Sequence, residues 1–526
     1  AGFAMGPSRV NPHTGEILDA DIIFDADFIR FWKQEYETFT PASVAALTGG
    51  ALEADALHQE LNGTPERSRR HAECRCNLLH GFTRQLAFGA SVLSIRHGMA
   101  ESKPMSDKMI LEGLKEVAMH EVGHTLGLRH NFKASTMLTL KEANDPKITA
   151  AKGMVASVMD YAPANLVPKS EKQGPYYTET IGPYDYWAIE YGYKTQSGGT
   201  DGEVAALKKI ASRSAQPDLD YATDEDTYGS SPDPLTNRFD LGKDPLNYAK
   251  QQAQVVREIW PDMVERVTEK GEGYQKARRA FGLLLSTHGR SMFFAARYVG
   301  GIYVHRDHKG DPKARAPIVV VDAKKQREAL KLLEEQVFND KPFQFPAELY
   351  NHLASTRWYH WGARPTTRVD YPIHEYILLW QNRILSQLLS STMLERLHDS
   401  ELKIPADQDA FTAAELLERL TEAVFKEVGV LKPGNYTNRK PAISSLRRNL
   451  QREYLRRLST LALGRTSAPE DCQTVAYLQL VELQGRMKSL LGQNKIKLDV
   501  YSRAHLTESV QRIGKVLEAR ITLSSF

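Results

Sequence analysis

Cysteine is scarce in this chain, and long apolar runs are absent. The 526 residues include 3 cysteines, and no apolar stretch approaches the roughly 18 residues that a membrane-spanning helix requires. No integral membrane segment is therefore predicted. Cys74 and Cys76 would point in different directions on one helix, so at most one disulfide can form, with Cys472 as the third thiol. No fourth-ligand spacing accompanies these cysteines, which argues against a structural zinc site there.

An excess of charge of one sign is also missing. The chain has 68 Lys and Arg against 65 Asp and Glu, a net charge of +3, and 41% hydrophobic residues. This balance argues against a disordered chain and against a nucleic-acid partner, because the basic clusters at 276–279 and 306–309 are typical of solvated surfaces. The length allows two or more domains, each with its own core. No feature of the sequence indicates an oligomeric state.

The most informative segment covers residues 120–130 and reads HEVGHTLGLRH. With about 3.6 residues per turn, His120 and His124 share one face of a helix and are close enough to bind one metal ion. Gly127 is placed where the helix must end, and glycine tolerates the left-handed backbone that brings His130 back to the same ion. These three imidazoles would leave one position of a tetrahedral zinc open for water, and Glu121 would act as the general base.

The specificity of this pattern depends on its length. The five-residue core is a moderately specific signal that chance can produce, whereas the full spacing with Gly127 and His130 is much stronger. His374-Glu375 begins in the same way, but position 378 is leucine, so His374 is interpreted as an ordinary helix residue.

A proline-free, largely apolar segment surrounds the two helical histidines. No proline occurs between residues 109 and 128, which predicts a helix there. Leu111, Ala118 and Val122 lie opposite His120 and are expected to pack onto a core.

A second motif follows at residues 157–163, SVMDYAP. Together with residues 120–130 it resembles the metzincin clan of zinc peptidases, in which a tight turn carries a methionine beneath the metal. The resemblance implies that Met159 is this Met-turn residue and a polarisable floor under the imidazoles, not a ligand. It also implies that Tyr161 stabilises the tetrahedral intermediate. The alternatives stay open, since a lone methionine usually fills a core and a lone tyrosine usually packs.

The chain is also similar to the large bacterial Met-zincin-domain proteases, many of them known only as domains of unknown function. The similarity is carried by residues 6–9, 12–22, 130–135, 182–189, 221–226 and 503–506. It implies an extracellular or periplasmic location, although no signal peptide is visible. It further implies an α+β fold, in which a metzincin-like catalytic domain lacking its first strands and helix precedes a mostly α-helical C-terminal region.

Composition divides the chain into three parts. Residues 1–200 are assigned to the peptidase domain, 201–244 to an Asp/Gly/Pro-rich linker, and 245–526 to a mostly helical domain with one β-hairpin, 298–304 with 318–321. Residues 18–24 alternate in polarity and predict a half-buried strand.

Carboxylates of the linker could gather Ca²⁺, but their spacing fits no EF-hand and acidic loops are usually solvated. They are Asp218, Asp220, Asp224, Glu225, Asp226 and Asp233.

The leading hypothesis is a zinc metalloendopeptidase that acts on a protein or peptide. The alternative is a pseudo-protease or binding protein with a structural zinc, whose helical half recognises a protein or a glycan. Glu121 argues against a purely structural metal, and no aromatic platform for a glycan is evident in the sequence.

Overall fold

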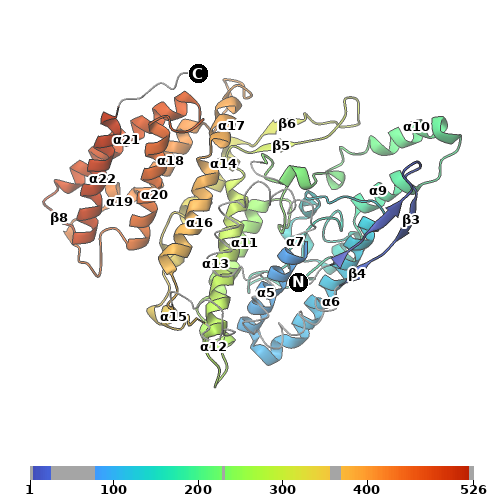
Figure 1. Cartoon of the computed structure of the whole chain (residues 1–526), viewed down its shortest axis with the longest axis horizontal. Helices are drawn as coiled ribbons and strands as arrows, with labels where there is room; N and C mark the ends of the chain where they lie inside the picture. The colour runs from blue at the N-terminus through green and yellow to red at the C-terminus, as the bar shows by residue number, and fades with distance from the viewer. Residues whose placement is uncertain (1–3, 25–77, 228–230, 356–368, 520–526) are drawn as a thin grey trace. The chain divides into compact units, whose positions relative to one another are not determined.

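The computed structural model describes residues 4–24, 78–227, 231–355 and 369–519. The chain forms two compact units (Figure 1). Unit 1 comprises residues 1–294, 303–319 and 345–371, and unit 2 comprises 295–302, 320–344 and 372–526. The division interleaves the two units between residues 294 and 372, so each unit is built from segments that are separated in the sequence.

Helices dominate both units, and the strands are short. The longer helices are α5 (Leu78–His97), α6 (Met99–Thr125), α9 (Pro183–Tyr193), α10 (Gly199–Ala211), α11 (Pro245–Ile259), α13 (Gln275–Ala296), α14 (Ala323–Gln336), α16 (Ile373–Leu388), α17 (Ser391–Glu401), α18 (Ala413–Val424), α20 (Ser445–Ala462), α21 (Glu470–Leu491) and α22 (Val500–Glu518). The shorter α-helices are α7 (Leu140–Ala143), α8 (Pro146–Lys152), α12 (Met263–Val267), α15 (Ala347–Asn351) and α19 (Lys426–Val430). This content is compatible with the predicted α+β class.

All the described strands occur in two-stranded sheets. The pairs are β1 (Ala4–Met5) with β4 (Ile23–Phe24), β2 (Ser8–Val10) with β3 (Ile17–Ala20), β5 (Ile302–Val304) with β6 (Ile318–Val320), and β7 (Gly434–Asn435) with β8 (Ile496–Lys497). The β5–β6 pair lies within the hairpin predicted at 298–304 with 318–321, but residues 297–300 form a turn. The predicted strand at 18–24 is split between β3 and β4 and is not half-buried, since Leu18 is 55% exposed. A two-stranded ribbon has no second layer to cover it.

Helices α5 and α6 pack against each other in unit 1, after a turn at Gly98, whose φ is +85°. Two glycines let them approach closely. A Cβ on Gly89 would lie 2.4 Å from the sulfur of Met109, and one on Gly113 would lie 2.6 Å from the ring of Phe82. Helix α6 is thereby fixed against α5 along the stretch that leads to His120.

The buried face of α6 differs from the predicted one. Leu111 is 66% and Val122 is 41% exposed, whereas Glu116 and His120 are 4% and 1% exposed. The prediction assigned the interior to the side opposite His120. The structure reverses this, because the histidine face itself is turned inward and carries further buried carboxylates.

Unit 2 has a core of its own, in which α18, α20, α21 and α22 pack together (Figure 1). Polar side chains define where these helices begin. Ser444 accepts a hydrogen bond from the Arg447 N–H at the start of α20, and Asp499 accepts one from the Ser502 N–H at the start of α22. Cys472, on α21, is buried and its thiol is free, while Cys74 and Cys76 lie outside the described residues.

A search of the described helices for a segment both long and apolar enough to span a bilayer finds none.

Candidate metal centre

The end of α6 places His124 and turns the chain toward His130. The Gly127 N–H donates to the carbonyl of His124 at 2.9 Å, and the Leu128 N–H donates to the carbonyl of Gly123 at 3.0 Å. This pair of bonds is a Schellman motif, which requires a left-handed residue after the helix. Gly127 supplies it with a φ of +81°. A side chain there would meet no neighbour within 4 Å, so the glycine is needed for its backbone conformation alone.

Each of the three histidines has its Nδ1 next to an oxygen acceptor. His120 Nδ1 lies 2.7 Å from the carbonyl oxygen of Val158, and His124 Nδ1 lies 3.0 Å from that of Leu128. His130 Nδ1 lies 2.7 Å from a carboxylate oxygen of Asp224. These oxygens accept a hydrogen bond, so each Nδ1 carries the proton and each Nε2 presents a lone pair.

The Nε2 lone pairs converge. The Nε2 atoms of His124 and His130 are 3.2 Å apart, and ligand atoms of all three histidines lie within 4.8 Å of one another. Two lone pairs at that separation repel each other unless a cation lies between them. Three neutral imidazoles held in one tautomer are the ligand set of a catalytic zinc. His120, His124 and His130 therefore fit a metal ion.

Met159 lies directly against α6 at Gly123, the residue before His124. A Cβ on Gly123 would be 2.2 Å from the Met159 sulfur, so only glycine fits the helix at this point. Met159 is fully buried within a tight turn closed by the Asp160 N–H and the carbonyl of Ser157 at 3.3 Å.

Asp185, on α9, holds this turn in place. Its carboxylate accepts hydrogen bonds from the Ser157 hydroxyl at 2.6 Å and from the Val158 N–H at 3.0 Å. Burial raises the pKa of Asp185, and these hydrogen bonds oppose that increase. Since the carbonyl of Val158 orients His120, Asp185 acts on the candidate ligand through the turn. The sequence indicated residues 182–189 only as a sign of family identity.

Tyr161 and Glu121 complete the arrangement. The Tyr161 hydroxyl lies 3.1 Å from His130 Nε2, so the phenol points at the place where the lone pairs meet. Tyr161 and Glu121 are both 1% exposed. Glu121 directly follows His120 on α6, and both side chains are shielded from water.

Asp224 was predicted only as part of an acidic loop, and the structure places it beside His130. Its second oxygen accepts a hydrogen bond from Arg238 at 3.1 Å, and Arg238 stacks over the ring of Phe132 at 4.7 Å. Burial opposes ionisation of Asp224. The hydrogen bond with His130 and the positive charges of Arg238 and Arg129 nevertheless hold its pKa below the ordinary value. A carboxylate behind a histidine fixes the ring and increases its basicity as a ligand.

The neighbouring carboxylates of this segment pair with cationic side chains of the protein. These pairs are Asp220 with Arg315, Glu225 with Arg129, Asp226 with Arg306 and Asp233 with Lys133. Within the described ranges, the histidine triad is the group of side chains that is suitable for a metal ion. The predicted calcium site therefore has no support here.

The segment predicted as a linker is attached to the site through Asn131. The Asn131 side-chain amide donates to the carbonyl of Asp220 at 2.9 Å and its oxygen accepts from the Ala222 N–H at 3.2 Å. Its own N–H donates to the carbonyl of Met159 at 3.0 Å. Asn131 is fully buried and thus joins the loop that carries His130, the turn at 157–160 (the methionine turn) and residues 220–226 (the acidic segment). The proposed domain boundaries remain a prediction.

Comparison with known proteins agrees with this geometry. The search found no match among curated proteins or among solved structures. A family model described as Met-zincin matches residues 102–430, which include the histidines, Met159 and Asp224. That match covers more than half of the chain. The chain therefore belongs to the Met-zincin family.

Proposed function

We propose that this protein is a zinc-dependent metalloendopeptidase. The observation that carries the proposal is the convergence of the three imidazoles, together with the buried Glu121 that directly follows His120 on α6. When bound by His120, His124 and His130, zinc would supply a water of lowered pKa and would polarise a peptide carbonyl.

The chain's own residues supply the proton transfers. Glu121 accepts a proton from the attacking water and later delivers it to the leaving amine. Tyr161 donates a hydrogen bond to the oxyanion that develops from the scissile carbonyl. Met159 contacts the helix at Gly123, fills the space below the imidazoles and keeps water out. An extracellular or periplasmic location stays a prediction from the family resemblance.

The test is cleavage of a diverse peptide library by the zinc-loaded protein and by its Glu121→Gln variant. The amide cannot accept the proton, so turnover should fall by about a hundredfold or more while zinc remains bound. A chelator should abolish cleavage, and added zinc should restore it. Peptide turnover is followed by mass spectrometry and bound zinc by elemental analysis.

Glu116→Gln is the matched control. Glu116 lies on the same helix and is buried, and burial raises its pKa well above the ordinary value, which favours the protonated form that an amide resembles. The Glu116→Gln variant should therefore retain peptide turnover. Full turnover in Glu121→Gln would falsify the assignment of the base. Bound zinc without any cleavage would favour the alternative of a binding protein.

A further inference from the structure

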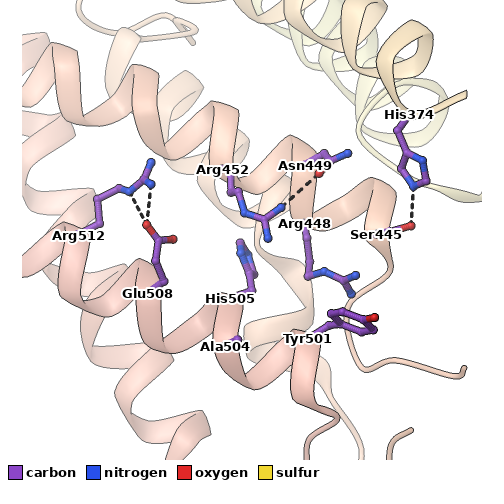
Figure 2. Close-up of a pocket in the computed structure, with 10 residues that line it drawn as sticks. All are labelled: His374, Ser445, Arg448, Asn449, Arg452, Tyr501, Ala504, His505, Glu508 and Arg512. Atoms are coloured by element: carbon purple, nitrogen blue, oxygen red, sulfur yellow. Dashed lines mark hydrogen bonds and ion pairs between the residues drawn. The ribbon is translucent and has the colours of Figure 1, made fainter. Parts of the chain in front are cut away.

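A pocket in unit 2 lies outside everything described so far. It has a volume of about 430 Å³ and is formed by α20 and α22 together with the start of α16 (Figure 2). Arg448 and Arg452 contribute from α20, and Tyr501, His505 and Arg512 contribute from α22. His505 belongs to the 503–506 segment, to which the proposed peptidase assigns no role.

The charges lining the pocket are unbalanced. Arg512 pairs with Glu508 at 2.6 Å along the same helix. Among the described residues, Arg448 and Arg452 form no ion pair. Arg452 donates only to the side chain of Asn449 at 3.2 Å. Besides the Arg512–Glu508 pair, the pocket therefore presents two guanidinium groups that are not paired with a carboxylate of the described residues.

Arg448 is the more deeply placed of the two. It is 8% exposed, donates to the carbonyl of Ile443 and lies 5.1 Å from the centre of the Tyr501 ring. Burial lowers its pKa, and Asp499 opposes this from a distance. A largely buried cation is costly when it is not paired, and an anionic ligand would offset that cost.

His505 adds a hydrogen-bond acceptor to the pocket wall. It is 2% exposed, and its Nε2 lies 2.8 Å from Gln451 Oε1. The Gln451 amide is oriented by its own donation to Val424 and Glu427, so Oε1 must accept and Nε2 carries the proton. Desolvation and the charges of Arg452, Arg448 and Arg512 lower the pKa of His505 to about 3, so the ring is neutral. Its Nδ1 is a buried acceptor without a donor among the described residues.

We propose that this pocket binds a small phosphate monoester that carries a hydroxyl group. A monoester has a charge near −2 at neutral pH, which matches Arg448 and Arg452. Guanidinium groups bind phosphate oxygens with paired, charge-assisted hydrogen bonds. The hydroxyl would donate to Nδ1 of His505, and Tyr501 would pack against the organic part. The volume suits a small organic ligand rather than a bare ion.

Calorimetric titration of the full chain tests this at neutral pH with glycerol 3-phosphate, methyl phosphate and sulfate. Glycerol 3-phosphate should bind, and methyl phosphate and sulfate should bind at least about tenfold more weakly because they leave Nδ1 without a donor. Arg452→Gln should lower the affinity for glycerol 3-phosphate by about tenfold or more. Arg452 is exposed and makes one hydrogen bond, so this variant should fold normally.

Arg503→Gln is the control, because it removes an exposed positive charge from α22 that does not line the pocket. It should bind glycerol 3-phosphate as the parent does. Equal affinity in Arg452→Gln and the parent would overturn the proposal, since the ester would then bind elsewhere, for example at the metal. Equal affinity for sulfate and glycerol 3-phosphate would overturn it as well. Glu121→Gln should leave this binding unchanged, so failure of the peptidase proposal would be seen separately.

Discussion

At the scale of single residues, Asp224 supports the candidate centre directly, because its carboxylate contacts His130. It holds His130 through a 2.7 Å hydrogen bond and is itself held by Arg238. Without the carboxylate, the His130 ring loses both its orientation and the negative charge that strengthens its lone pair. For metal binding, we expect the contact of Asp224 with His130 to matter more than the negative charge of the surrounding loop.

Replacing Asp224 with alanine should therefore lower zinc affinity by about 10- to 100-fold while the fold is kept. Competition with a chromophoric chelator measures that affinity, and circular dichroism checks the fold. Glu225→Ala is the matched control, because Glu225 is the adjacent carboxylate and pairs with Arg129 at the surface. Its zinc affinity should equal that of the parent. A similar loss in both variants would mean that general negative charge, and not the contact with His130, determines affinity.

At the scale of elements, the packing of α6 on the methionine turn depends on Gly123. The Met159 sulfur occupies the space that a side chain at this position would need. The helix could move away only by displacing His120 and His124, which lie on either side of the glycine.

Gly123→Ala should destabilise the protein by about 1–3 kcal/mol, because overpacking forces the backbone to shift. Adding Met159→Ala should recover part of the loss, so the two effects should not be additive. Urea denaturation measures the free energies of unfolding. Gly192→Ala on α9 is the control, since a side chain there meets nothing within 4 Å, and it should be neutral or slightly stabilising. Additive losses in the double variant would contradict direct contact between these two residues.

The helix and its histidine spacing could be predicted because their causes are local. His120 and His124 are one turn apart, and the stop at Gly127 follows from its backbone freedom. Asp185 and Asp224 could not be predicted as supports, because their partners are distant in the sequence. Asp185 binds the Val158 N–H, 27 positions before it, and Asp224 binds His130, 94 positions before it. Polarity alone also misled the assignment of the buried face of α6. A helix that carries metal ligands can turn its polar side inward.

At the scale of the whole molecule, the two units have separate cores. Unit 1 buries a cluster that includes Met154, Leu241 and Tyr248, and unit 2 buries Leu416, Leu450 and Leu480. The candidate metal ligands all belong to unit 1. A ligand stabilises the part of a protein whose folded state binds it.

Scanning calorimetry of the zinc-loaded protein should therefore show two transitions, and a chelator should lower only one of them. The lowered transition is expected to belong to unit 1, because removing zinc removes binding free energy from that unit alone. His124→Ala should reproduce the chelated profile and should not respond to chelator. A single transition that moves as a whole would show that the units unfold cooperatively.

The long separation between the histidines and their supports has a consequence for biosynthesis. His130 emerges from the ribosome before Val158, Asp185 and Asp224, which orient the candidate ligands. A nascent chain that ends before Asp224 carries the complete histidine motif but lacks the carboxylate that orients His130. We therefore expect a translation product that is abandoned before Asp224 to bind a metal ion more weakly than the full chain, because its His130 ring is not held in place.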